Sequence, residues 1–571
     1  FLITLYGYDT SGERVVCHVR KYKPYVYLKI PNGWETDTHL VDTLLRKIRG
    51  DTPLKVSHTI HTMKEFYGFH WNAESDKPQL FAFVKLSFET LRDLKTMLRC
   101  VRDYYECGLT NPETIPETLK PWFDREIMKT TDKCDCNIYE SFIHPVVRFI
   151  HEQKIDPTGF VSVEPDVGPK MYLTGLYDDD EFSCEYKSVK KADINETSPY
   201  VIASFDIECD SSHGDFPQTQ KFFKKLATDI FDTTMNLANK CVLSAHKKKL
   251  HKESYYEELL QLAFNLQTTE EITSIPLNLS KHIDVNLVYT SDNRKPSPET
   301  LQTLATAIAT HKPFIDTVGN ADALTGKQRD KQINGIRKLI VKNLTDGENI
   351  EEAGDPVIQI GTVFHKYGTN ETKRHIAVMG PRTDMTDAEI CDDLDDYDIE
   401  VERCSDESSL LLAWTSKIRE ENPDFITGYN IFGFDFKYLL DRAKIVLPCP
   451  KTKRGHLKCG RYHCQDCPYR KFLNFGKIDS TKEETRSHYN KCCKEIEKEL
   501  TSSALGENTL TYIAMDGRIL FDIQKEVSKG HSLESYKLDN VASHFMRGKL
   551  KEVLDSEDES RILTDTQNLK A

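Results

Sequence analysis

The sequence lacks any long hydrophobic run. No stretch of its 571 residues approaches the roughly 18 consecutive apolar residues of a membrane-spanning helix, so we expect no membrane partner. The N-terminus, from Phe1 to Tyr6, also lacks the basic start and long apolar segment of a secretory signal. Because the sequence does not begin with methionine, we expect it to be a fragment of a longer chain.

The sequence has too few cysteines for a disulfide scaffold and fewer basic than acidic residues. The 16 cysteines are irregularly spread and far below the density of a small secreted disulfide scaffold, which favours a reducing, intracellular compartment. With 76 Lys and Arg against 90 Asp and Glu, the net charge is -14. This charge excludes a protein that coats nucleic acid by bulk attraction. Local basic channels stay open as an alternative, because phosphate contacts need only a few placed cations.

The length predicts three or four domains, at roughly 100 to 200 residues for each domain. Residues 1–195 mix alternating, strand-like runs with helical spacing, and we expect an α+β, β-rich N-terminal domain there. Its first strands, at residues 2–6 and 25–30, are expected to form one small β-rich module. Another strand is expected at 79–86, and helices at 40–48, 90–102 and, beginning with Pro145, at 145–153.

From residue 200 the pattern is that of an α/β core. Residues 200–208 form an almost continuous apolar run that ends in two carboxylates, which is typical of a buried strand. Further strands are expected at 356–364, 375–379 and 424–427, and helices at 405–420 and 433–443. The core domain therefore comprises residues 196–217 and 354–571.

The interval at residues 218–353 is polar and helix-patterned, and is predicted to be a helical insertion in this core. Eight lysines lie between residues 218 and 252. They form either a DNA-facing patch or a solvated helical face.

The end of the first core strand carries a candidate metal site. Asp206 and Glu208 are two residues apart on a strand, so both side chains leave the same face. Neighbouring carboxylates repel each other unless a cation lies between them, and Mg²⁺ prefers oxygen ligands. Asp435 follows a Gly-rich turn into a helix. It either joins these carboxylates or only stabilises the helix N-terminus.

A cysteine cluster offers a second candidate site. Cys459, Cys464 and Cys467 have the spacing C-x4-C-x2-C, within a basic loop. One reading is a Zn²⁺ site, although a typical structural site has two C-x2-C pairs. The other reading is free thiols in a loop whose Lys and Arg contact phosphates.

Taken with the order of the elements, three runs resemble the exonuclease domain of family B DNA polymerases, whose fold is RNase H-like. The runs are Phe205-Asp206-Ile207-Glu208-Cys209, Asp355-Pro356-Val357-Ile358-Gln359-Ile360-Gly361 and Ile426-Thr427-Gly428-Tyr429-Asn430-Ile431-Phe432-Gly433-Phe434-Asp435. Segments at 139–150, 502–506, 516–519 and 535–545 are similar to the same family, so the resemblance covers residues 1–217 and 354–550. Delta-like polymerases of eukaryotes and large DNA viruses are the most similar subgroup, and residues 543–549 favour a giant virus.

The resemblance implies the N-terminal and proofreading 3'-to-5' exonuclease portion of a replicative DNA polymerase. Asp206, Glu208 and Asp435 would hold two Mg²⁺ or Mn²⁺ ions that hydrolyse a phosphodiester at a DNA 3' end.

The same resemblance implies that Tyr429, Asn430 and Phe434 contact DNA. The implied partners are the primer 3' end, the single-stranded template, the palm, fingers and thumb of the same polymerase, and a sliding clamp. The implied place of action is the nucleus or a viral replication factory.

Two departures limit this resemblance. The third exonuclease motif of the family, a Tyr followed four residues later by Asp, is missing here. Tyr536 is followed four residues later by Asn540, and in the family this Tyr-x-Leu segment precedes the third motif. The polymerase motifs of the palm are absent as well, so this chain alone should not polymerise. We expect the sequence to stop just short of the third motif. Asp522 could be mistaken for the last carboxylate, and we interpret it as structural.

Two alternatives stay open. The first is a catalytically silent module that binds single-stranded DNA or braces the polymerase. The second is a free-standing RNase H-like nuclease, which would need its fourth carboxylate inside this chain.

Overall fold

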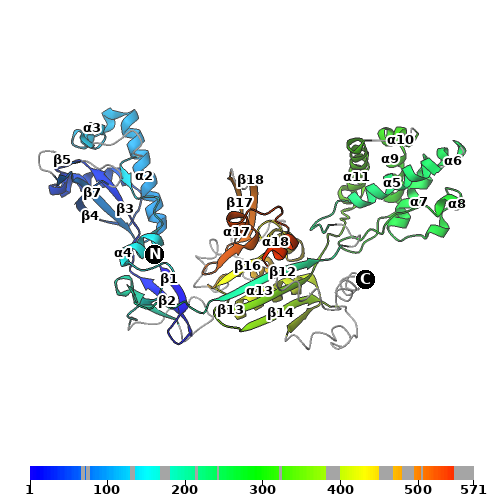
Figure 1. Ribbon diagram of the computed structural model, residues 1–571. Coiled ribbons are helices and arrows are strands. Elements are labelled where there is room, and N and C mark those ends of the chain that lie inside the picture. The colour runs from blue at the N-terminus through cyan, green and yellow to red at the C-terminus, as the bar shows by residue number, and fades with distance from the viewer. Residues whose placement is uncertain are drawn as a thin grey trace. The chain divides into compact units, whose positions relative to one another are not determined.

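The computed structural model divides into two compact units, Phe1–Pro199 and Tyr200–Ala571 (Figure 1). It describes residues 1–571 except for 66–70, 73–76, 129–135, 167–180, 212–215, 241–243, 320–324, 381–398, 449–466, 479–493, 503–505 and 546–571. In the described part no helix has the length and apolar character needed to cross a membrane.

The first unit contains two main sheets. The smaller has the strand order β1-β2-β10, formed by β1 (Ile3–Tyr8), β2 (Arg14–Arg20) and β10 (Glu181–Glu185). The larger has the order β4-β7-β3-β8, formed by β4 (Val56–Met63), β7 (Phe81–Phe88), β3 (Tyr25–Ile30) and β8 (Ile138–Tyr139). Residues 2–6 and 25–30, which were expected in one β-rich module, both lie in this unit but in different sheets. Pro24 separates the β2 strand from β3, and β3 then pairs with partners much further along the chain.

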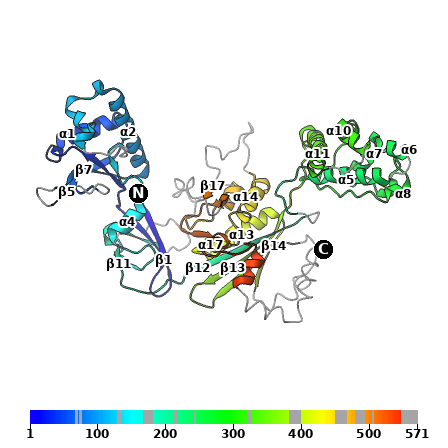
Figure 2. The same ribbon diagram turned by 45° about the horizontal axis from the view of Figure 1, so that its top comes forward.

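Two helices cover one face of the larger sheet, α1 (Thr38–Arg49) and α2 (Leu91–Thr110), and Figure 2 shows both beside β7. Each begins at a side-chain cap, because Asp37 accepts hydrogen bonds from the backbone of α1 and Thr90 from that of α2. The predicted helix α4 (Pro145–Gln153) is confirmed, with Pro145 in its first turn. The remaining elements are short: α3 (Arg125–Met128), β5 (Trp71–Asn72), β6 (Lys77–Pro78), β9 (Val161–Ser162) and β11 (Lys190–Lys191).

The second unit is built on a six-stranded mixed sheet in the order β15-β14-β13-β12-β16-β19. Its strands are β12 (Val201–Cys209), β13 (Val357–Lys366), β14 (Thr372–Met379), β15 (Ile399–Cys404), β16 (Phe425–Gly428) and β19 (Ile519–Asp522). β12 runs antiparallel to β13 and parallel to β16. The predicted α/β core is confirmed, but β15 and β19, at the two edges of the sheet, were not predicted.

Helices α13 (Glu407–Glu421) and α14 (Asp435–Val446) pack against this sheet through a core of large rings. Phe205 of β12 lies 4.9 Å from Trp414 of α13 and 5.3 Å from Phe436 of α14, measured between ring centroids. The unit is completed by α15 (Pro468–Phe472), the hairpin of β17 (Glu495–Ser502) and β18 (Gly506–Ile513), α17 (Ile523–Gly530) and α18 (Leu538–Phe545). The packing of β12 and α14 on one core fixes the candidate site residues that these two elements carry.

The interval between β12 and β13 is helical and has its own apolar core, which includes Tyr255, Tyr256 and Phe314. Its helices are α5 (Lys224–Lys240), α6 (Ser244–Lys249), α7 (Glu253–Ala263), α8 (Leu277–Ser280), α9 (Pro298–Ala309), α10 (Lys312–Gly319) and α11 (Gly326–Glu348). A separate core of this kind means that the segment does not depend on the sheet for its burial of apolar surface.

Candidate active site

The alternation of β12 exposes two carboxylates on one side of the strand. Phe205 and Ile207 are buried in the core of the second unit, whereas Asp206 and Glu208 are exposed. This arrangement agrees with the expectation that both carboxylates leave the same face, because successive side chains of a strand point to opposite faces. The backbone of both residues pairs with β13, Asp206 opposite Gly361 and Glu208 opposite Gln359, whereas β16 pairs with residues 202–204 of β12.

Asp435 is the first residue of α14 and is almost fully buried, with 3% of its surface exposed. Burial raises the pKa of its carboxyl group to about 7, and repulsion from the neighbouring Asp206 adds to the shift. The structure therefore brings Asp206 and Asp435 together although they are far apart in the sequence. The alternative that Asp435 serves only its own helix does not explain this contact.

The turn between β16 and α14 aims Asp435 at β12. Gly428 ends β16, and a Cβ there would lie 2.6 Å from the carbonyl oxygen of Phe205, so only glycine allows the two strands to approach this closely. Asn430 adopts a left-handed backbone with φ of 58°. Its side-chain oxygen would lie 2.4 Å from a Cβ at Gly433, which explains the second glycine of the turn.

Asp522 holds this turn in place from the end of β19. Its carboxylate accepts hydrogen bonds from the backbone N–H groups of Asn430 at 2.9 Å and of Phe432 at 3.1 Å. It also caps α17 by accepting a hydrogen bond from the N–H of Gln524 at 3.0 Å. These bonds occupy the carboxylate with backbone donors, in agreement with the interpretation of Asp522 as structural.

The donor set fits a hard divalent cation. Oδ1 of Asp435 is buried and has no hydrogen-bond partner among the residues that the structure describes, which is costly for a carboxylate oxygen. Asp206 lies beside it, and Glu208 leaves the same face of β12. Within the described ranges, no three His, Cys, Asp or Glu side chains lie close enough to form a complete metal cluster. The oxygen-only donors, one of them without a partner, are those that Mg²⁺ and Mn²⁺ prefer.

Comparisons with known proteins assign the domain that carries these residues to a family. The family model of the exonuclease domain of DNA polymerase family B matches residues 136–224 and 342–541, which is half of the chain. The chain belongs to the family B DNA polymerases. Its mixed sheet, with Asp206 and Glu208 on β12, lies in the matched exonuclease domain and fits an RNase H-like core.

Two viral relatives cover nearly the whole chain. It is 27% identical over 96% of its length to a DNA polymerase of Pyramimonas orientalis virus, and 26% identical over 97% to one of Phaeocystis pouchetii virus. It spans 40% and 52% of the length of these two polymerases. The DNA polymerase delta catalytic subunit of Drosophila melanogaster is 28% identical over 38% of this chain, and the match covers 15% of the length of that subunit. Among solved structures, a family B DNA polymerase of Pyrobaculum calidifontis matches with a TM-score of 0.38 at 12% identity, over 95% of this chain and 37% of that one.

The predicted DNA contacts of this family B chain lie on the turn before α14. The hydroxyl of Tyr429 donates to the carbonyl oxygen of Tyr536 at 2.6 Å, so this side chain also braces the segment before α18. Phe434 is half-buried, and its ring centroid lies 5.5 Å from that of Phe216.

Phe216 was missed by the sequence reasoning. It lies beyond the end of β12, is 72% exposed and contacts a ring that precedes Asp435. Its signal in the sequence was a large aromatic residue a few positions after the carboxylate pair.

The base of the helical segment is tied to the same helix that carries Asp435. Tyr438 of α14 donates to the carbonyl oxygen of Asp355 at 2.9 Å, and Arg442 donates to that of Thr219 at 2.9 Å. Arg442 is itself held by Glu407 of α13 at 2.6 Å. These contacts join the base of the helical segment directly to α14.

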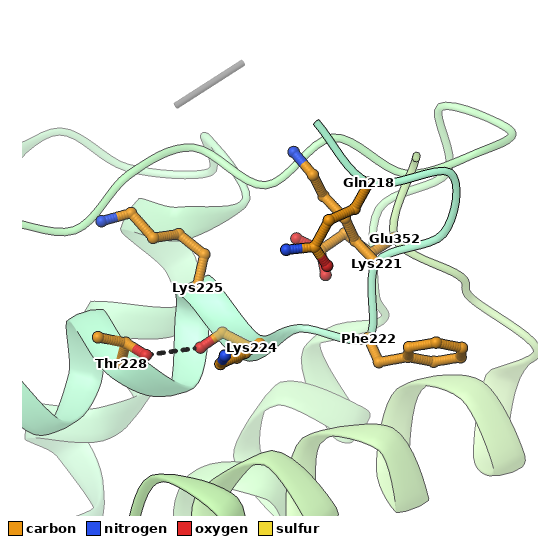
Figure 3. Close-up of a pocket in the computed structure, with 7 residues that line it drawn as sticks. All are labelled: Gln218, Lys221, Phe222, Lys224, Lys225, Thr228 and Glu352. Atoms are coloured by element: carbon orange, nitrogen blue, oxygen red, sulfur yellow. Dashed lines mark hydrogen bonds between the residues drawn. The ribbon is translucent and has the colours of Figure 1, made fainter. Parts of the chain in front are cut away.

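A pocket of about 130 Å³ lies at this base, lined by Gln218, Lys221, Phe222, Lys224, Lys225, Thr228 and Glu352. In Figure 3 the side chains of Gln218, Lys221 and Glu352 gather on one side of it. Lys221 pairs with Asp355 at 2.6 Å and Lys225 with Asp229 at 3.0 Å. These ion pairs offset two of its three lysine charges, which argues against a DNA-facing patch at this part of the lysine-rich run. Lys221 is itself buried, so it does not belong to a solvated face either.

Most of the candidate zinc site lies outside the described residues. This holds for Cys459 and Cys464. Cys467 is described, is buried, and occupies the cap position before α15. The structure therefore does not test the zinc prediction.

Proposed function

We propose that the chain is the N-terminal and 3'-to-5' exonuclease part of a replicative DNA polymerase, and that it hydrolyses the terminal phosphodiester at a DNA 3' end. The observation that carries this proposal is the buried Asp435 beside Asp206, in the domain that the exonuclease family model matches. A structural carboxylate would have its oxygens satisfied, as those of Asp522 are. A carboxylate oxygen without a partner, next to a second carboxylate, is the arrangement that a metal-dependent nuclease uses.

Asp206, Glu208 and Asp435 would hold two Mg²⁺ or Mn²⁺ ions. When bound, such ions lower the pKa of the attacking water and stabilise the charge on the leaving 3'-oxygen. The chain's own contribution is to keep Asp435 at a pKa of about 7, so that in the absence of a cation the pair retains a proton near neutral pH. Cation binding would then release that proton, which makes binding tighter as the pH rises.

The DNA strand would enter beside Phe216 and Phe434. Phe216 is 72% exposed, and a base can stack on its free surface while Phe434 supports the ring from the side of α14. We keep Tyr429 and Asn430 as further DNA contacts, although their described bonds also serve the turn itself.

The direct test is digestion of a 5'-labelled single-stranded oligonucleotide by the purified chain. With Mg²⁺ we expect a ladder of products that shorten from the 3' end, and with EDTA we expect no shortening. A 5'-labelled end that is removed first, or trimming that persists in EDTA, would contradict the proposal.

Replacing Phe216 with alanine is expected to raise the KM for a single strand about tenfold and to change kcat little. A base stacked on an aromatic ring contributes roughly 1 to 3 kcal/mol of binding. Phe222→Ala is the matched control, because Phe222 is also an exposed ring of the same segment, at 50% exposure, but lines the pocket at the base of the helical segment. The measurement is the initial trimming rate against strand concentration for the three proteins. An equal KM for the two variants would remove Phe216 from the DNA path.

A second candidate function has one observation in its favour. No third exonuclease motif was identified in the sequence, so the carboxylate set comprises Asp206, Glu208 and Asp435 without the last carboxylate of the family. This favours a catalytically silent module that binds single-stranded DNA or braces the polymerase. The two candidates differ in the digestion test, since the silent module would bind the strand without shortening it.

The wider setting is also part of the proposal. The chain would work with the palm, fingers and thumb of a longer polymerase, with a primer-template and with a sliding clamp, in the nucleus or a viral replication factory. Within it, residues 1–195 would form the N-terminal domain, 196–217 and 354–571 the exonuclease domain, and 218–353 the helical insertion. A Zn²⁺ ion at Cys459, Cys464 and Cys467 stays a prediction.

A further inference from the structure

The first unit contains a sheet whose chemistry the exonuclease site does not use. The larger sheet of that unit arises in the chain order β3, α1, β4, β7, α2, β8, and its strands lie in the order β4-β7-β3-β8. This β-α-β-β-α-β arrangement is ferredoxin-like. RNA-recognition modules likewise present a four-stranded sheet, whose aromatic side chains stack on nucleic-acid bases.

The two faces of this sheet differ in chemistry. Val26 and Leu28 of β3 belong to the apolar core that α1 and α2 complete. The alternation of a strand therefore sends Tyr25 and Tyr27 to the other face. On β7 the neighbours of Phe83 belong to the same apolar core, so Phe83 also points away from the helices.

Four rings, one from each strand, form what we call the aromatic face: Tyr27, His61, Phe83 and Tyr139. The centroid of Phe83 lies 5.3 Å from that of Tyr139 and 6.4 Å from that of Tyr27, which in turn lies 6.3 Å from His61. Phe83 is buried, the two tyrosines are half-buried and His61 is exposed. Phe83 thus supports a row of rings whose outer members reach solvent.

The sequence of β7 agrees with this function of the sheet. The run Phe81-Ala82-Phe83-Val84 follows the Phe/Tyr, Gly/Ala, Phe, Val order at the centre of the strand motif of RNA-recognition modules. The basic and glycine positions that precede this centre in the motif are Gln79 and Leu80 here. The aromatic position that closes the motif is Leu86 here, so the match covers the four residues from Phe81 to Val84 alone.

Cations border the aromatic face. Lys85 of β7 lies 3.6 Å and Arg148 of α4 lies 4.1 Å from the ring centroid of Tyr25. Arg148 is paired with Glu140 at 2.6 Å. Lys85 has no carboxylate at ion-pair distance in the part of the chain that the structure describes. Burial lowers the pKa of Lys85, although the nearby Glu152 opposes this, so an anion beside its ammonium group would be favoured.

The other charges near this face offset one another. Lys29 is buried and pairs with Glu65 at 3.0 Å. Tyr139 donates a hydrogen bond to the same carboxylate. Tyr25 donates to Glu152 of α4. Among the described cations named here, Lys85 is thus the one that a phosphate can reach without breaking an ion pair.

We propose that the aromatic face binds single-stranded DNA, with bases stacked on Tyr27 and Tyr139 and a phosphate beside Lys85. Single-stranded DNA is the partner because the rings offer stacking surfaces and Lys85 offers a positive charge, and because the chain belongs to a family of DNA polymerases. The choice of DNA over RNA rests on the proposed function. The site lies in the first unit and the exonuclease carboxylates lie in the second, so the two can be tested separately.

The test measures the affinity of the full chain for fluorescently labelled oligothymidylate by anisotropy, in EDTA so that no trimming occurs. All variants also carry Phe216→Ala, which weakens the other single-strand contact. We expect Tyr27→Leu to lower the affinity about fivefold or more, and Tyr27→Phe to restore it, since a stacked base contributes roughly 1 to 3 kcal/mol. Tyr289→Leu, at a 55% exposed tyrosine of the second unit, is the matched control.

A second variant tests the phosphate contact without altering the rings. Lys85→Gln should reduce the slope of log affinity against log salt by roughly 0.7, the value for one phosphate contact on a single strand. Photo-crosslinking of iodouracil-containing oligonucleotides should label peptides that contain Tyr27 or Tyr139. Mg²⁺-dependent trimming of short strands should be unchanged in Tyr27→Leu, which separates this site from the exonuclease.

Three results would overturn the proposal. One is an equal affinity of Tyr27→Leu and Tyr289→Leu. Another is the confinement of crosslinks to the second unit. The third is tighter binding of oligouridylate than of oligothymidylate, which would assign the face to RNA. Failure of the exonuclease proposal would instead show as trimming that does not depend on Mg²⁺.

Discussion

Replacing Asp206 with alanine is expected to slow Mg²⁺-dependent trimming of a DNA 3' end by roughly a thousandfold. Metal ions at a hydrolytic site contribute several kcal/mol of transition-state stabilisation, and each 1.36 kcal/mol is a factor of about ten in rate. Asp206 is exposed on β12, so its loss should leave the apolar core intact. The measurement is the single-turnover trimming rate of a 5'-labelled strand, with circular dichroism as a check on folding.

Glu420→Ala is the matched control for this experiment. Glu420 is a carboxylate of the same unit on α13, and 69% of its side chain is exposed. We expect its loss to leave trimming unchanged. If the wild-type chain trims and both variants trim equally fast, the carboxylates of β12 do not carry the reaction. If no protein trims but all bind the strand, the chain is either the silent DNA-binding module or an exonuclease domain without its third motif, and Asp206→Ala in the full-length polymerase separates the two.

The same substitution in the natural full-length polymerase should leave primer extension intact, because the proposed hydrolytic site lies in the exonuclease domain. Loss of trimming and extension together would contradict two separate sites.

The core strands and the carboxylate pair could be predicted because their signals are local. An apolar run that ends at Asp206 and Glu208 indicates both a buried strand and a shared face, since the side-chain period of a strand is two residues. The start of α14 at Asp435 was predicted to within two residues from a Gly-rich turn followed by helical spacing. None of these inferences needed knowledge of a distant partner.

The pairing of distant segments could not be predicted in the same way. β15 and β19 lie at the edges of the sheet. β15 carries charged residues between its apolar ones, and β19 is only four residues long, so neither has the long apolar run of a central strand. Phe216, which follows β12, contacts Phe434, which precedes α14. In the sequence the whole helical segment lies between these two residues. Nothing in the local sequence around Phe216 identifies that partner.

The N-terminal unit shows the same limit at the level of topology. The strands at residues 25–30 and 79–86 were predicted, but their pairing was not. Once β3 lies between β7 and β8, the alternation of Tyr27 and of Phe83 places both rings on one face. The aromatic face therefore depends on the order of the strands in the sheet. The alternation of side chains within one strand does not reveal that order.

Replacing Asp435 with asparagine is expected to stabilise the metal-free chain at pH 8 by about 2 to 4 kcal/mol. The pKa of Asp435 is about 7 in the folded chain, against an ordinary value of 3.8. The folded state thus holds a proton that the unfolded state has lost, and stability falls as the pH rises from about 4 to about 7. Above pH 7 the folded chain carries the full cost of the buried charge, which asparagine removes. The pKa of Asp435 rises from 3.8 to about 7, and each pKa unit corresponds to about 1.36 kcal/mol, which sets the upper limit of the expected stabilisation.

The measurement is the unfolding temperature of both proteins in EDTA between pH 4 and pH 8. The advantage of Asp435→Asn should be several degrees at pH 8 and should shrink steadily as the pH falls. Asp441→Asn is the control, because Asp441 lies on the same helix but is paired with Lys437 at 3.0 Å at the surface. Its stability should follow the wild-type pH profile.

Mg²⁺ should reverse the order of the two proteins. A ligand at about 100 times its Kd stabilises the folded state by about 2.7 kcal/mol. We expect the wild-type protein to show this gain in stability and Asp435→Asn to show little of it. The wild-type gain should also be larger at pH 8 than at pH 5, because at low pH the cation competes with the proton on the Asp206–Asp435 pair. If Mg²⁺ stabilises both proteins equally, or neither, Asp435 does not hold the cation. A flat pH profile for the difference between the proteins would show that its buried carboxyl group titrates normally.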